Sequence, residues 1–406
     1  MSHLFNDLVG FKGDAVDAFN RLRTSTPFTL FDSQHRYKEN PYWDTLTVTG
    51  GSKSYSENES VINMTVDGQS GAKVVRETKK VFAYQPGKSL LVINSFVFNQ
   101  KKENLRQRVG YFGERNGIYL EQVGNETYLV LRSYVNGSVD STTRRIAQSD
   151  WNEDDFLGNG RSGVTLDLSK SNLMWMDIEW LGVGSVRVGF FVEGRPVVAH
   201  TFRNENLNST TYMTTATLPL RYEIENLAAT NSSSTLKQVC STVISEGGYE
   251  AFTRKYNITK SGASAFPLAT ASVEYPMIAL RLNSNRLDSV VIPNALTVAL
   301  DELSNNKPAI IQYKFLINPS LSGGSWVTHS NGNIDYNITA TSISGGTDLI
   351  GGYVSSNASL NVSGINDFNL QLGRTLGGTS DVFVLAFIPT VSGTNAYADL
   401  SWYELT

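Results

Sequence analysis

Apolar and polar residues alternate in short runs along most of the chain, with turn-forming residues between the runs. The clearest run has an apolar residue at every second position: Val186, Val188, Phe190 and Val192. Because successive side chains of a β-strand point to opposite sides, this spacing predicts a strand with one apolar face. Glu193-Gly194 then predicts a tight turn, and the apolar residues that resume at Val197 predict a return strand.

The same pattern predicts strands throughout the first part of the chain. Besides those between Arg108 and His200, the predicted strands lie at residues 28–31, 44–50, 60–67, 73–84, 89–98, within 211–224 and at 238–244. Residues 89–98 are almost wholly apolar, which is typical of a central strand buried on both faces. Glu246-Gly247-Gly248 follows and is the strongest signal of a domain boundary in the chain.

Charged residues become sparse after this boundary. Lys and Arg number 8 from residue 250 onward and 26 before it, while Asn, Ser, Thr and Gly dominate the later part. Predicted strands recur there at residues 277–282, 289–292, 296–300, 309–317, 353–361, 367–372, 381–388 and 396–404. Short strands with Gly, Ser and Asn turns are typical of a sandwich. We therefore predict an all-β protein with two β-sandwich domains, residues 27–248 and 249–406.

Residues 1–26 are predicted to form a short N-terminal helical arm. Ala15, Phe19 and Leu22 share one helix face, with Asp14 as a candidate N-cap. One short amphipathic helix is marginal alone, so we expect the arm to dock on its own sandwich or on a neighbouring subunit. The first residues lack the apolar run of a secretory signal, and no stretch is long enough to span a membrane. Synthesis in a cytoplasm is expected.

The composition argues against several kinds of partner and cofactor. The 34 Lys and Arg against 38 Asp and Glu give a formal net charge of -4, which argues against nucleic acid or a membrane surface as partner. The four histidines are widely separated and lack metal-ligand spacing, and a single cysteine cannot form an intrachain disulfide. We expect Cys240 to be a small buried apolar residue, and the chain to use no metal and no cofactor.

The acidic loop from Asp150 to Gly158 partly resembles a calcium-binding loop. Its oxygen-bearing side chains from Asp150 to Asp154 alternate as such a loop requires. Asp155, however, stands where the loop needs glycine, and Arg161 stands where it needs glutamate. This favours a solvated or interface loop over an ion site.

Two other motifs come close to known chemistry. Lys88 follows Pro86-Gly87, but the spacing of a phosphate-binding loop is absent. Asp177 and Glu179 lie two positions apart on a predicted strand and form the only suggestive carboxylate pair. Glycoside cleavage uses two carboxylates, but a structural role is favoured for this pair. We predict no catalytic residues and no enzyme.

A series of segments gives the chain a resemblance to a known family. The segments are Ala18–Arg23, Thr29–Ser33, Tyr84–Ser89, Arg108–Phe112, Asn116–Ile118, Gln148–Asn152, Trp180–Gly184, Leu218–Ile224, Cys240 and Glu246–Tyr249. In this order they resemble virion structural proteins of tailed phages, mainly marine ones, although Asn20 stands where those proteins have glycine. The family carries no activity to transfer, and residues beyond 250 resemble no family. The stretch from Val186 to His200 also looks like jelly-roll or concanavalin A-like sandwiches, a resemblance of fold alone.

The resemblance implies a non-enzymatic structural protein of a phage virion. We expect the arm and first sandwich to contact other virion proteins or sister subunits, with a homotrimer as the assembly and the second sandwich projecting outward. A component of the tail or fibre is favoured, with capsid decoration or head fibre as the alternative. A further alternative is a carbohydrate-binding module for the host surface, with Trp326, Tyr336 and Tyr353 as candidate ligand-binding residues.

Overall fold

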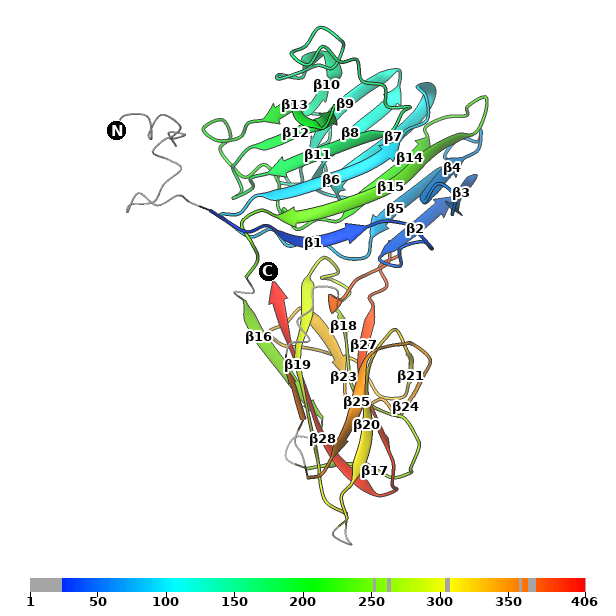
Figure 1. Ribbon diagram of the computed structural model, residues 1–406, viewed down its shortest axis with the longest axis vertical. Helices are drawn as coiled ribbons and strands as arrows, with labels where there is room; N and C mark the ends of the chain where they lie inside the picture. The colour runs from blue at the N-terminus through cyan, green and yellow to red at the C-terminus, as the bar shows by residue number, and fades with distance from the viewer. Residues whose placement is uncertain are drawn as a thin grey trace, which may run out of the picture.

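The computed structural model describes residues 24–250, 253–260, 264–303, 307–357, 360–363 and 370–405. These parts form two β-sandwiches that follow one another along the long axis of the molecule (Figure 1). The predicted all-β class with two sandwiches is confirmed, since every paired strand belongs to an antiparallel sheet. Residues 1–23, which make up most of the predicted arm, lie outside the described residues. No helix in the described ranges is long and apolar enough to cross a membrane.

Two antiparallel sheets build the first sandwich. Sheet I contains, in spatial order, β13 (Arg195–Phe202), β12 (Val186–Val192), β11 (Asn172–Ile178), β6 (Leu90–Val97), β15 (Ser234–Ser245), β4 (Val61–Val66) and β3 (Gly51–Ser56), with β1 (Phe28–Ser33) also paired to β15. Sheet II contains β10 (Arg145–Ala147), β9 (Glu126–Arg132), β8 (Gly117–Gly124), β7 (Lys102–Phe112), β14 (Leu220–Asn226), β5 (Lys73–Thr78) and β2 (Trp43–Val48).

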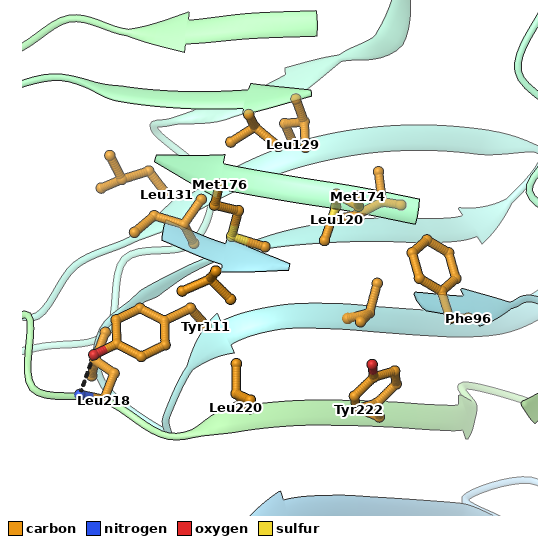
Figure 2. Packing of buried hydrophobic residues seen from close by; sticks show 14 of the residues in the cluster. Phe96, Tyr111, Leu120, Leu129, Leu131, Met174, Met176, Leu218, Leu220 and Tyr222 are labelled. Carbon is orange, nitrogen blue, oxygen red and sulfur yellow. Dashed lines mark hydrogen bonds between the residues drawn. The ribbon is translucent and has the colours of Figure 1, made fainter. Parts of the chain in front are cut away.

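The facing sides of the two sheets enclose the larger core. Met174 and Met176 of β11 point toward Leu120, Tyr111 and Tyr222 from sheet II (Figure 2). The apolar positions predicted for β12 lie in this core, and the turn after it has positive φ at both Glu193 (50°) and Gly194 (76°). Two positive φ angles match the twist of a hairpin, so both predictions are confirmed there.

Two predictions about burial in the first sandwich were wrong. Strand β6 alternates between buried and half-buried residues, so only one of its faces lies in the core. The reason is that its second face is the outward side of sheet I, which no further layer of the described residues covers. Cys240 is exposed rather than buried, because β15 has an irregularity between Gln238 and Cys240 that pairs Cys240 with Ser95 on that same outward side.

Buried charges form a network on the outward side of sheet II. Glu223 of β14 is 2% exposed and lies 2.9 Å from the Lys73 ammonium, 3.4 Å from Arg221 and 3.7 Å from Arg108. Arg108 also donates to Glu121 at 2.6 Å. Burial alone would raise the pKa of Glu223, but Arg221, Arg108 and Lys73 outweigh it and lower the pKa to about 2. The carboxylate is therefore ionised at neutral pH.

The second sandwich has a smaller core around Trp402. Sheet III contains β16 (Arg254–Lys260), β28 (Thr394–Leu405), β19 (Val290–Leu300) and β26 (Leu360–Ser363), with β17 (Phe266–Leu268) beside β28. Sheet IV contains β22 (Val327–Thr328), β23 (Ile334–Asn337), β18 (Tyr275–Leu282), β27 (Val382–Pro389), β20 (Ile310–Ile317) and β25 (Thr347–Ser355). A separate pair is formed by β21 (Ser320–Ser322) and β24 (Ser342–Ser344).

Strand boundaries in this half differ from the predicted ones in several places. The strands predicted at 289–292 and 296–300 are one strand, β19, with an irregularity between Pro293 and Ala295. A proline cannot donate to the ladder, which is why the pattern looked interrupted. The strand predicted at 353–361 is divided between β25 and β26. Of the strand predicted at 367–372, residues 367–369 lie outside the described part, and residues 370–372 form no strand, so the prediction is wrong for that half.

Specific contacts join the two sandwiches. Val81 packs with Val290 and Ile292 in a small apolar cluster of its own. The Gln371 amide donates to the Val81 carbonyl at 2.9 Å. Arg374 donates at 2.7 Å to Glu77, a 1% exposed carboxylate of sheet II that also accepts from Arg221 at 2.9 Å. The junction thus combines apolar packing with a buried ion pair.

Candidate functional site

An open polar cleft of about 530 Å³ lies beside the end of β11 in the first sandwich. We call it the β11 cleft. Its walls come from segments far apart in the sequence: Tyr84, Gly87, Lys88, Ser89, Asp177, Glu179, Leu181, Ser185, Arg187 and Glu246. It therefore brings the carboxylate pair noted in the sequence together with the segment around Lys88 and the boundary segment around Glu246.

The core pattern of β11 directs the two carboxylates into the cleft. Met176 and Ile178 are fully buried and face the core. Because side chains alternate along a strand, Asp177 and then Glu179, just past the strand end, face the other way. The hairpin partner β12 places Arg187 directly opposite Asp177. The position of the pair is thus set by the hydrophobic residues between its members.

Each charged group in the cleft already has a partner. Arg187 donates to Asp177 through its Nε, at 3.0 Å, and through Nη2. The Ser185 hydroxyl donates to Glu179 at 3.4 Å, and the Ser89 hydroxyl donates to Glu246. Arg187 keeps 55% of its side chain exposed, so most of its donor directions still face solvent. The site offers acceptors and donors side by side.

Apolar side chains complete the cleft wall. Leu181 is 54% exposed and sits in the turn that follows Trp180. Trp180 meets the Tyr84 ring edge to face at 5.8 Å, and its backbone amide donates to the Tyr84 hydroxyl at 3.2 Å. This contact fixes the tyrosine that lines the cleft and places an indole next to it.

The arrangement can bind a polar ligand. Asp177 contacts the Arg187 guanidinium, so the cleft presents a carboxylate and a cation side by side. Hydrogen-bonding groups of both kinds with an exposed apolar wall are what a ligand with many hydroxyls requires.

The acidic loop is held by its own side chains. Asp154 is 3% exposed and accepts hydrogen bonds from the amides of Phe156, at 2.9 Å, and Ser162, at 2.7 Å. Asn152 exchanges hydrogen bonds with the backbone of Thr201. The side-chain oxygens of Asn152 and Asp154, two of the candidate calcium ligands, are thereby engaged within the chain. Within the described residues, no group of three potential metal ligands comes together anywhere.

The three aromatic residues proposed from the sequence are not brought together. Tyr353 is 69% exposed on β25, at one edge of sheet IV, while Trp326 precedes β22 at the opposite edge. Tyr336 packs against the core of the second sandwich. The Trp326 ring is covered by the Arg281 guanidinium at 4.2 Å. These positions exclude one shared platform built from all three.

The comparisons with known proteins leave the family open. No protein-family model and no curated protein matches the chain. Similar solved structures include the Emp47p carbohydrate recognition domain (10% identity, 58% of this chain and 99% of that chain, TM-score 0.32) and a Bacillus licheniformis β-glucanase (10%, 54% and 99%, 0.33). A CBM2 module of an evolved Dit from Lactobacillus casei BL23 phage J-1 is also similar (6%, 56% and 100%, 0.34). The two-sandwich fold follows from this chain's own strand pairing.

Proposed function

We propose that this chain is a non-enzymatic carbohydrate-binding protein that holds a glycan in the β11 cleft. The observation that carries the proposal is the Asp177–Arg187 pair, which presents a carboxylate and a guanidinium side by side in an open cleft. Two planar charged groups can exchange several hydrogen bonds with neighbouring sugar hydroxyls. Leu181 and Tyr84 supply apolar contact for the ring.

The same geometry supports a protein that binds without cleaving. Hydrolysis of a glycoside needs one carboxyl as acid and a second as nucleophile or base. Asp177 is engaged in an ion pair with Arg187, and Glu246 accepts the Ser89 hydroxyl. Incubation of the full chain with the glycan it binds should therefore release no reducing ends. Release of reducing ends by the wild type, together with loss of this release in the Glu179→Gln variant, would identify the protein as a glycosidase instead.

Asp177→Asn tests the binding site directly. We expect the affinity for a bound glycan, measured by calorimetric titration, to fall roughly 10- to 100-fold, because a hydrogen bond to a charged group contributes about 1.5–3 kcal/mol. Stability should fall by about 1 kcal/mol, since the pair is partly solvated: Arg187 keeps 55% of its side chain exposed and Asp177 keeps 13%. Asp32→Asn, an exposed aspartate of the same sandwich outside the cleft, should bind like the wild type. Equal affinities of Asp177→Asn and wild type would refute the site.

We further propose that the chain serves as a structural component of a tailed-phage virion, in the tail or a fibre. The support is the resemblance of residues 15–250 and the junction, where apolar packing and the Glu77–Arg374 pair hold the second sandwich against the first. Such a junction suits a protein that projects one domain from an assembly. Reconstruction of purified particles should show its density at the tail, as a trimer. Density on the capsid lattice would assign capsid decoration, and absence of the chain from particles would refute a virion role.

A further inference from the structure

A second pocket, of about 490 Å³, opens in the second sandwich, far along the chain from the β11 cleft. It lies among the end of β16, strand β17 and the segment between β23 and β24. Its walls are mainly apolar and include Phe266, Tyr275 and Ile338. Lys260, the last residue of β16, lines it as its one charged side chain. We call it the Lys260 pocket.

Lys260 is a buried cation without a counter-charge among the described residues. The residue is 5% exposed. Its ammonium donates to the Ile338 carbonyl and lies 4.1 Å from the centre of the Phe266 ring. Lysines such as Lys53 and Lys314 have a carboxylate within 4.0 Å of their ammonium, but no described carboxylate lies that close to the ammonium of Lys260. Burial lowers the pKa of this ammonium to about 8, and no neighbouring charge opposes the effect.

Without a ligand, this arrangement lowers the stability of the folded chain. An ammonium has three donor hydrogens, and the contacts here account for one hydrogen bond and one cation–π contact. A buried charge without a partner lowers stability, and an apolar side chain of similar length would fill the same space without that cost. Lys260 also lines an open pocket, so a ligand bound there can supply the missing negative charge.

We propose that the Lys260 pocket binds the carboxylate of an acidic sugar. The ammonium faces the carboxylate, and the sugar ring lies against the apolar wall beside Phe266 and Tyr275. Two features favour a sugar over a bare anion: the volume of the pocket exceeds the need of a small ion, and aromatic side chains with few polar groups suit a ring with an apolar face. The site is separate from the β11 cleft and does not depend on the function proposed for that cleft.

The proposal predicts opposite effects of Lys260→Met on binding and on stability. Without the buried charge the variant should unfold at a higher temperature than the wild type, while it loses binding of D-glucuronate. This combination separates loss of the site from loss of the fold. Lys255→Met is the matched control, because Lys255 lies on the same strand and is exposed. It should bind D-glucuronate like the wild type and show no rise in unfolding temperature.

The experiment is a titration of the full chain, followed by NMR, with D-glucuronate, D-glucose, acetate and inorganic phosphate as separate probes. We expect saturable binding of D-glucuronate, at least 10-fold weaker binding of D-glucose, and weaker binding as the pH rises through about 8, where the ammonium loses its proton. Undiminished D-glucuronate binding by Lys260→Met, or no binding by the wild type, would overturn the proposal. Acetate or phosphate binding as tight as D-glucuronate would also overturn it, because the pocket would then recognise a bare anion.

Discussion

Replacement of Glu223 by glutamine should lower the free energy of unfolding of the first sandwich by about 3–5 kcal/mol, the usual cost of removing one partner from a buried ion pair. Glu223 is 2% exposed and faces the cations of Lys73, Arg108 and Arg221. Glutamine keeps the shape but removes the charge, so these cations and Arg106, 3.9 Å from Glu223, remain close together with less compensation. Denaturant unfolding followed by tryptophan fluorescence measures the loss.

Glu225→Gln is the matched control for this change. Glu225 lies two residues along the same strand, pairs with Arg106 and keeps 20% of its side chain exposed. A partly solvated pair contributes about 0–1 kcal/mol, so this variant should stay close to the wild type. Equal losses in Glu223→Gln and Glu225→Gln would show that burial of the network does not decide its energetics.

The pH dependence of stability gives a second measure of the same group. The pKa of Glu223 is about 2 in the folded chain and near 4.5 without the fold. A carboxylate with a lowered pKa stabilises the fold fully above its unfolded pKa and loses this contribution as the pH falls toward the folded pKa. The wild type should therefore lose stability between pH 4.5 and 2 more steeply than Glu223→Gln.

Replacement of Glu77 by glutamine should loosen the junction between the sandwiches. Glu77 accepts from Arg221 of its own sandwich and from Arg374 of the other, and it is 1% exposed. Loss of its charge leaves both guanidinium groups without their shared partner, again at a cost of about 3–5 kcal/mol. In scanning calorimetry we expect one transition in the wild type to separate into two, because the junction no longer couples the domains.

Asp288→Asn serves as the control for the junction. Asp288 pairs with the same Arg374, at 3.0 Å, but its side chain is 70% exposed. Its removal should leave the calorimetric trace nearly unchanged, since exposed pairs contribute little. A trace for Glu77→Gln that matches the wild type would mean that the apolar cluster around Val81 alone couples the two sandwiches.

The fold class could be predicted from the sequence because strand periodicity is a local property. The alternation from Val186 to Val192 and the Glu193-Gly194 turn each specify their own geometry, and both are confirmed. Burial on the second face of a strand is not local. Residues 89–98 are apolar on both faces, yet nothing in those residues specifies whether a further layer covers sheet I. Cys240 was misplaced for a related reason, because an irregularity of β15 changes its register.

The candidate sites could be predicted only in part. Asp177 and Glu179 stand out at spacing two, and their shared direction follows from the strand. The residues that complete the cleft, such as Lys88 and Glu246, lie about 90 and 70 positions away in the sequence, and only the sheet pairing brings them there. The burial of Lys260 could not be predicted from the sequence, because a lysine at a strand end is expected to be exposed unless surrounding loops cover it.

The most direct test of glycan binding in the β11 cleft is a crystal structure of the full chain with an oligosaccharide selected on a glycan array. We predict sugar density within hydrogen-bond distance of Asp177 and Arg187, with one ring against Leu181. Sugar density elsewhere on the chain, with the β11 cleft empty of sugar, would contradict the account. Silence across the array for the wild type would contradict it as well.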